Sequence, residues 1–105
     1  MNGLIERYKS FLDEGKTERE CVRRTIALAE ANGYRRLESV ESLKCGDKVY
    51  VEDYEKAIAL FHIGSEPMEK GMNILGAHID SPRLDIKMNP LYESEGLVYL
   101  DTHYY

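Results

Sequence analysis

The sequence predicts an α/β fold in which two amphipathic helices precede a hairpin and the buried strands of a mixed sheet. Apolar residues recur at helical spacing through about the first third of the chain. Beyond residue 46, shorter apolar runs of strand length replace that pattern. Turn residues such as Gly64 and Pro90 separate these runs, as expected for strands. Helices followed by strands indicate an α/β or α+β unit.

The two helices are expected at residues 2–14 and 17–32. In the first, the apolar positions fall on one helical face and Gly15 supplies the stop. In the second, Thr17 and Glu20 have the spacing of a capping box, in which each side chain bonds the other residue's backbone amide. Gly33 supplies a left-handed exit. The segment 37–44 is ambiguous and is assigned to neither class.

Strands are expected in the rest of the chain. Val49 and Val51 alternate with an outward Tyr50, and the run 57–63 suits a central strand covered on both faces. Residues 73–79 form a second buried strand, which ends where Pro82 blocks further pairing. A short alternation at 84–87 leads to a turn at residues 89–90, and residues 96–105 form a last extended segment.

Composition excludes several classes of protein. The 105 residues include 14 basic and 19 acidic side chains, for a net charge of −5, and fit one domain. An acidic chain without a basic stripe is not expected to bind nucleic acid. No apolar run is long enough to span a membrane, so no membrane partner is expected. The two cysteines, Cys21 and Cys45, match no metal or redox spacing and are read as reduced thiols of a cytoplasmic protein.

His78 and Asp80 carry the most informative chemistry. Two positions apart on a strand, they project from the same face, where a buried strand enters a loop. A neutral imidazole is a good metal ligand, and a nearby carboxylate can fix its tautomer and orientation. Spacing alone leaves open a simpler interpretation, a strand-end histidine bonded to a neighbouring acid.

The remaining polar candidates are weaker. His62 lies in an apolar run and is interpreted as a core or edge histidine, while His103 has no evident partner. Nothing favours a three-histidine zinc site formed by these two residues and His78, although the spacing does not exclude one. Arg83 and Lys87 could meet a substrate carboxylate, but surface solvation is the simpler role.

A family resemblance adds to the interpretation of His78 and Asp80. The run from Gly76 to Lys87, GAHIDSPRLDIK, followed by NPLY at 89–92 and THYY at 102–105, resembles the M18 family of zinc aminopeptidases. The similarity is narrower to the bacterial branch, which is related to aspartyl aminopeptidases. The hairpin 46–64 and the leading helices also suit the N-terminal region of that family, so the resemblance covers nearly the whole chain.

The resemblance implies a function and two site residues. His78 corresponds to a zinc-liganding histidine, and Asp80 to the catalytic aspartate that orients it. Family members are implied to hold two zinc ions bridged by a carboxylate, with a glutamate as general base. A metal-activated water then hydrolyses the N-terminal residue from a peptide substrate. A homo-oligomer is implied for the complete enzyme.

The chain also departs from the family pattern. The further metal ligands and the glutamate lie far downstream in family members and have no counterpart here, and a catalytic zinc needs about three protein ligands. Residues 1–105 are therefore expected to be the N-terminal portion of a metalloaminopeptidase catalytic domain, cut short and inactive alone. The alternative is a non-catalytic interaction module that docks through its open strand edges.

Overall fold

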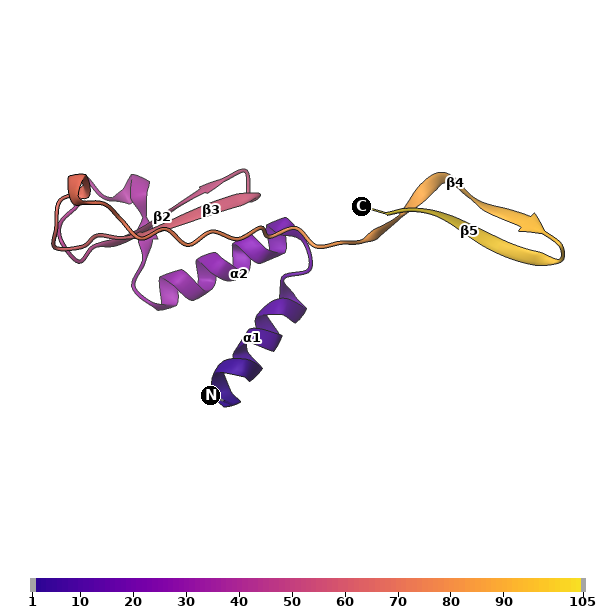
Figure 1. Cartoon of the computed structure of the whole chain (residues 1–105), viewed down its shortest axis with the longest axis horizontal. Coiled ribbons are helices and arrows are strands. Elements are labelled where there is room, and N and C mark those ends of the chain that lie inside the picture. The colour runs from indigo at the N-terminus through magenta and orange to yellow at the C-terminus, as the bar shows by residue number, and fades with distance from the viewer. Residues whose placement is uncertain (1, 105) are drawn as a thin grey trace.

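The computed structural model describes residues 2–104. Its elements are two α-helices, five strands and two short 3₁₀ turns, in the order α1 (Asn2–Glu14), α2 (Glu18–Ala31), β1 (Arg35–Arg36), η1 (Leu37–Ser39), β2 (Lys48–Asp53), β3 (Ala57–His62), η2 (Met68–Lys70), β4 (Leu84–Ser94) and β5 (Leu97–Tyr104). Figure 1 shows them in chain order. The predicted fold class, helices followed by strands of a mixed sheet, is confirmed.

Both predicted helices are present. Thr17 caps α2: its hydroxyl oxygen accepts from the Glu20 amide at 3.2 Å. The Thr17 hydroxyl also donates to the Glu20 carboxylate at 3.0 Å, so that carboxylate contacts the hydroxyl where the capping box predicted the backbone amide. After α2, Gly33 has φ of 89°, the left-handed exit that its position predicted.

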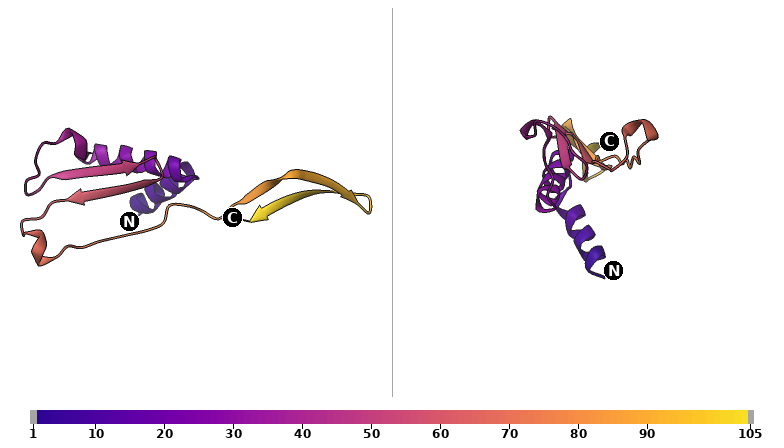
Figure 2. Two further views of the ribbon diagram at one scale, coloured as in Figure 1. Left: turned by 90° about the horizontal axis from the view of Figure 1, so that it is seen from above. Right: turned by 90° about the vertical axis from the view of Figure 1, so that its left-hand side faces the viewer.

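The first sheet has the strand order β1-β2-β3. β1 runs parallel to β2, whereas β2 and β3 form the predicted antiparallel hairpin, with Lys48 opposite His62 and Asp53 opposite Ala57. Tyr54 and Glu55 adopt positive φ in the connecting turn. In Figure 2 the hairpin lies alongside α2. The mixed sheet therefore rests against this helix.

The core is small, and Val22, Val49 and Tyr50 are its wholly buried members. The prediction that Tyr50 points outward is wrong. Its hydroxyl donates to the Glu30 carboxylate of α2 at 2.9 Å, so the ring lies under that helix. Because neighbours on a strand face opposite sides, burial of both Val49 and Tyr50 means that β2 is the strand covered on both faces.

The two strands that were predicted to be buried, 57–63 and 73–79, differ in the structure. β3 forms an edge of the first sheet, and its Leu60 and Phe61 are each 42% exposed. Residues 71–83 have no regular secondary structure, and Leu75 within them is fully exposed. The apolar runs fit burial in a larger sheet, but among residues 2–104 no strand covers them.

The last two strands form a separate hairpin. The predicted turn at residues 89–90 is wrong, because β4 continues through Pro90 to Ser94. Its register with β5 is irregular between Ile86 and Leu91. Proline lacks the amide that a ladder needs, so an irregularity at this point is expected. The last extended segment is confirmed as β5, apart from Tyr105, which lies outside the described residues.

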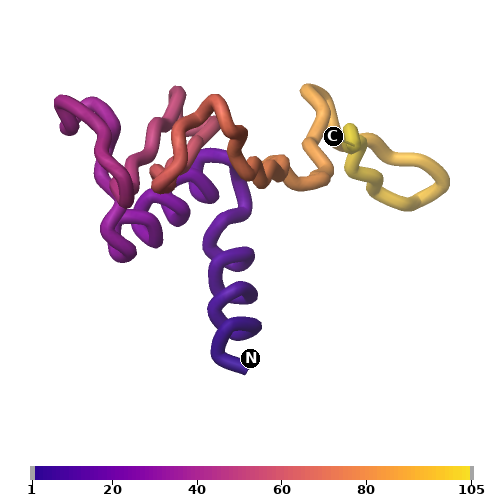
Figure 3. Tube along the Cα trace, turned by 60° about the vertical axis from the view of Figure 1, so that its left-hand side comes forward, coloured from indigo at the N-terminus to yellow at the C-terminus, as the bar shows by residue number. Residues whose placement is uncertain are grey.

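The molecule is elongated. Its principal extents are 69 × 32 × 26 Å and its radius of gyration is 20.3 Å, against about 13 Å for a compact chain of this size. Figures 1 and 3 show the β4–β5 hairpin standing apart from α2 and the first sheet. Within residues 2–104, the stretch of chain after η2 connects these two regions.

Candidate functional site

The segment that carries His78 and Asp80 is residues 71–83, which connect the first sheet to the β4–β5 hairpin. In Figure 1 it runs as an extended ribbon past the sheet and α2. The prediction of a strand at 73–79 is therefore not met in this structure, and His78 lies within a loop. Regular structure resumes at Leu84, four residues after Asp80.

The His78 and Asp80 side chains are nevertheless brought together. His78 Nδ1 lies 3.0 Å from Asp80 Oδ1 and 3.0 Å from the Asp80 carbonyl oxygen. The side chains are 82% and 54% exposed, respectively. The carboxylate thus contacts the imidazole as the sequence predicted, and the backbone carbonyl is a second partner that side-chain spacing did not predict.

These contacts determine the tautomer of neutral His78. A carbonyl oxygen and an ionised carboxylate can only accept hydrogen bonds. The His78 Nδ1 atom must therefore carry the proton and donate it to Asp80. Nε2 is then unprotonated, and its lone pair faces away from Asp80. This is the arrangement in which metal-binding imidazoles are commonly held, with one nitrogen oriented by a carboxylate and the other free for the metal.

As a metal site, this pair supplies one donor atom. A catalytic zinc takes about three protein ligands. Within residues 2–104, no group of three or more His, Cys, Asp or Glu side chains is placed to hold a metal ion. The chemistry of His78 thus fits one position of a zinc site, and the other ligands would have to come from outside the described residues.

The other histidines lie elsewhere. His62 ends β3 opposite Lys48 and lines a groove beside α2. His103 lies in β5 opposite Asp85. The three-histidine alternative thus gains no support from the described part of the chain. Both cysteines are free thiols, with Cys21 buried and Cys45 exposed.

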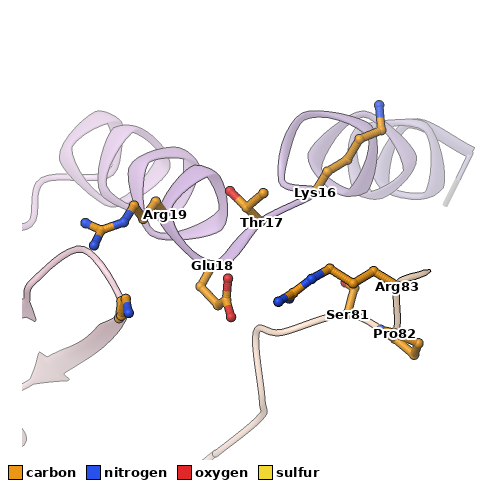
Figure 4. Close-up of a pocket in the computed structure, with 8 residues that line it drawn as sticks. Lys16, Thr17, Glu18, Arg19, Ser81, Pro82 and Arg83 are labelled. Atoms are coloured by element: carbon orange, nitrogen blue, oxygen red, sulfur yellow. The ribbon is translucent and has the colours of Figure 1, made fainter. Parts of the chain in front are cut away.

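A cleft adjoins the candidate site. Its lining comes from two distant parts of the sequence, the α1–α2 junction and the residues directly after Asp80, with one residue from the β2–β3 turn: Lys16, Thr17, Glu18, Arg19, Lys56, Ser81, Pro82 and Arg83. Figure 4 shows Glu18 and Arg83 facing each other across it. Sequence patterns did not predict this cleft, because its two main walls are more than 60 residues apart and share no motif.

The basic residues after the motif are anchored locally. Arg83 Nε donates to Asp85 at 3.0 Å, and Lys87 lies 3.7 Å from Asp101 across the hairpin. Both pairs are about half exposed, so neither contributes much to stability.

None of the helices within residues 2–104 is long and apolar enough to cross a membrane.

Comparisons with known proteins show the family of this chain. Residues 11–105 match the family model described as aminopeptidase I zinc metalloprotease (M18). The chain is 54% identical over 106 residues to a probable M18 family aminopeptidase 1 of Clostridium acetobutylicum, covering 97% of this chain and 23% of that protein. It is 38% identical over 105 residues to the Thermotoga maritima protein of the same description, covering all of this chain and 23% of that relative.

Solved structures agree as well. The crystal structure of aminopeptidase I from Borrelia burgdorferi B31 superimposes with a TM-score of 0.76 at 36% identity. The superposition covers 99% of this chain and 26% of the Borrelia burgdorferi chain. The fold and the match together define a part of a metallopeptidase. The chain belongs to the M18 family, and it spans about a quarter of the length of the relatives it matches.

Proposed function

We propose that this chain is the N-terminal portion, residues 1–105, of an aminopeptidase catalytic domain that removes N-terminal residues from peptides. The observation that supports this most is the His78–Asp80 pair. His78 is the metal ligand, binding through Nε2, because Nδ1 is occupied by Asp80. Asp80 fixes the orientation of the ring and keeps the proton on the nitrogen that faces away from the metal.

Two zinc ions, when bound, would activate a water molecule and stabilise the oxyanion that forms at the scissile carbonyl. This chain's contribution is to hold one of them in place. Its remaining ligands and the general base would come from beyond the described residues, so we propose that the 105-residue chain has no turnover by itself. We further propose that the complete enzyme is a cytoplasmic homo-oligomer with no nucleic-acid or membrane partner.

The direct test is substitution of His78 in the protein at its full native length. His78→Ala should remove about one equivalent of zinc per chain and nearly all hydrolysis of N-terminal residues. The matched control is His62→Ala, which removes an imidazole from β3. Full zinc content and turnover in His78→Ala would show that this residue is not a ligand.

Asp80 has a separate test. Asp80→Asn keeps the size of the side chain but removes the charge that stabilises the Nδ1 proton, so turnover should fall by about tenfold or more, as is typical for such supporting partners. Asp101→Asn removes a carboxylate from β5 and should have no such effect. Equal activity of the two variants would rule out a role for Asp80 in orienting the metal ligand.

One observation favours the second candidate, an interaction module. One face of the β4–β5 hairpin carries six apolar side chains, each at least 52% exposed: Leu84, Ile86, Leu91, Val98, Leu100 and Tyr104. An isolated two-stranded hairpin is only marginally stable in water, so this face is suited to being covered. Light scattering of the 105-residue chain distinguishes the candidates, because a folded monomer at micromolar concentration would contradict docking between copies.

A further inference from the structure

The turn that joins β2 to β3 holds two large residues in a backbone conformation that favours glycine. Residues 54–56 form this turn, and Tyr54 and Glu55 have φ of 50° and 55°. A side chain at positive φ is repelled by its own backbone, so turns usually place Gly, Asn or Asp at such positions. The β4–β5 turn follows that rule in part, since Gly96 comes directly after Glu95. The β2–β3 turn contains no glycine.

Contacts from α2 and β2 hold this turn in place. Arg19 Nη1 donates to the Tyr54 carbonyl at 3.0 Å, and Arg23 Nη2 donates to the Glu55 carboxylate at 2.9 Å. The Glu55 amide donates to the Glu52 carboxylate, also at 2.9 Å. These contacts use the backbone of the turn and the half-buried Glu55 side chain. None of them uses the Tyr54 side chain, so the turn does not need a tyrosine at this position.

Burial does not stabilise the Tyr54 ring either. Tyr54 is 82% exposed, more than any other tyrosine within residues 2–104. Strained backbone of this kind persists where the surrounding structure imposes it, and it is concentrated at sites that contact ligands. A fixed turn that presents an exposed aromatic side chain is therefore suited to contact with a ligand.

The same turn borders the cleft beside the candidate site. The cleft measures about 490 Å³, which is within the range of small-ligand pockets. Its lining includes Lys56, the last residue of the turn, and Ser81, which directly follows Asp80. Extended chain spans at most about 3.6 Å per residue, so Tyr54 lies within about 7 Å of Lys56, and His78 within about 11 Å of Ser81, measured between Cα atoms. The cleft thus connects the turn with the candidate metal ligand.

We propose that Tyr54 contacts a peptide substrate beyond its N-terminal residue, with the peptide running from the His78–Asp80 pair through this cleft to the turn. This inference rests on the proposed aminopeptidase function. The tyrosine ring offers an apolar face and a hydroxyl to an extended peptide. Because the turn is already fixed, little conformational entropy is lost on binding. Tyr54 is then a specificity-determining residue for longer peptides, and a substrate with a single amino-acid residue does not reach it.

The test uses the protein at its full native length and two substrates, a pentapeptide and an aminoacyl amide with the same N-terminal residue. Tyr54→Asn removes the ring and introduces a residue that tolerates positive φ. KM for the pentapeptide should rise by about threefold to tenfold, as expected for loss of an aromatic contact, with kcat unchanged. KM for the aminoacyl amide should stay the same. The thermal midpoint of unfolding should rise, because the backbone strain is relieved.

Two further variants are matched controls. Tyr54→Phe keeps both the aromatic ring and the strained backbone, so KM for the pentapeptide and the thermal midpoint should stay close to the wild-type values. Glu95 has φ of 52° in the β4–β5 turn and does not line the cleft. Glu95→Asn relieves the same kind of strain there, so it should raise the thermal midpoint without changing either KM.

The outcomes separate this inference from the proposed function. Unchanged KM for the pentapeptide in Tyr54→Asn would overturn the inference while the enzyme remains an aminopeptidase. An equal rise of KM for both substrates would also overturn it, because the contact would then not lie beyond the first residue. So would a lower thermal midpoint in Tyr54→Asn, which would mean that the ring packs against another part of the protein. No hydrolysis of either substrate by the wild-type enzyme would contradict the proposed function and this inference together.

Discussion

The region formed by α2 and the first sheet differs from residues 71–104 in what surrounds its apolar side chains. Val49 in β2 is wholly buried, whereas Val98 in β5 is 75% exposed, although both lie in antiparallel hairpins. Every buried residue of the described chain belongs to α2 or β2. Both regions thus contain an antiparallel hairpin, but burial also requires a covering element, and α2 covers only the first sheet.

The largest predicted effect tests this difference in burial at the two valines. Val49→Ala removes two buried methyl groups and should lower the free energy of unfolding by about 2–3 kcal/mol. Val98→Ala makes the same chemical change on an exposed strand and should change it by less than about 0.5 kcal/mol. Urea unfolding followed by circular dichroism measures both. Similar losses in the two variants would show that the hairpin is packed in solution.

An intermediate effect is expected at Tyr50. Tyr50→Phe removes the hydroxyl that donates to Glu30 and should cost about 1 kcal/mol of stability. Burial, and next the hydrogen bond to Glu30, raise the pKa of Tyr50 above its ordinary value of 10.0. A raised pKa means that the folded state favours the protonated form, so this stability is complete below pH 10.0 and is lost as the pH rises through the folded-state pKa.

The variant tests that pH dependence. Between neutral pH and pH 11, wild-type stability should fall more steeply than that of Tyr50→Phe, because the variant has no ionisable group at position 50. Tyr99→Phe, in the exposed hairpin, is the control. Parallel stability curves for wild type and Tyr50→Phe would contradict the burial of this hydroxyl.

The smallest effect concerns α1. Arg24 Nε lies 2.8 Å from Glu14 Oε2 and links α2 to the end of α1. Both side chains are about half exposed, so Glu14→Gln should cost only about 0.2–1 kcal/mol, and less in high salt. Amide exchange in α1 should quicken while exchange in β2 stays unchanged. Faster exchange throughout the first sheet would mean that α1 is part of the same cooperative unit.

The sequence predicted local structure better than burial. Thr17 and Gly33 located both ends of α2, because capping and left-handed exits are local. Tyr50 and the apolar run at 73–79 were placed wrongly, since which face or strand is covered depends on elements distant in the chain. The prediction at 89–90 failed because a β-strand can absorb a proline at an irregular register.

In the candidate site, too, the local contact could be predicted but the contacts between distant segments could not. His78 and Asp80 are two residues apart, and their contact needs only local geometry, so spacing sufficed. The family resemblance supplied their proposed roles, which remain predictions. The cleft between the α1–α2 junction and Ser81–Arg83 could not be predicted, because it exists only once the chain has folded back on itself.

The central claim is that Asp80 holds the His78 ring with Nε2 free for a metal. Long-range ¹H–¹⁵N correlation spectra of the imidazole nitrogens at alkaline pH, without metal, test this most directly. We predict a protonated Nδ1 and an unprotonated Nε2 for His78, and loss of that preference in Asp80→Ala. A proton on Nε2 in the wild-type protein would contradict the claim.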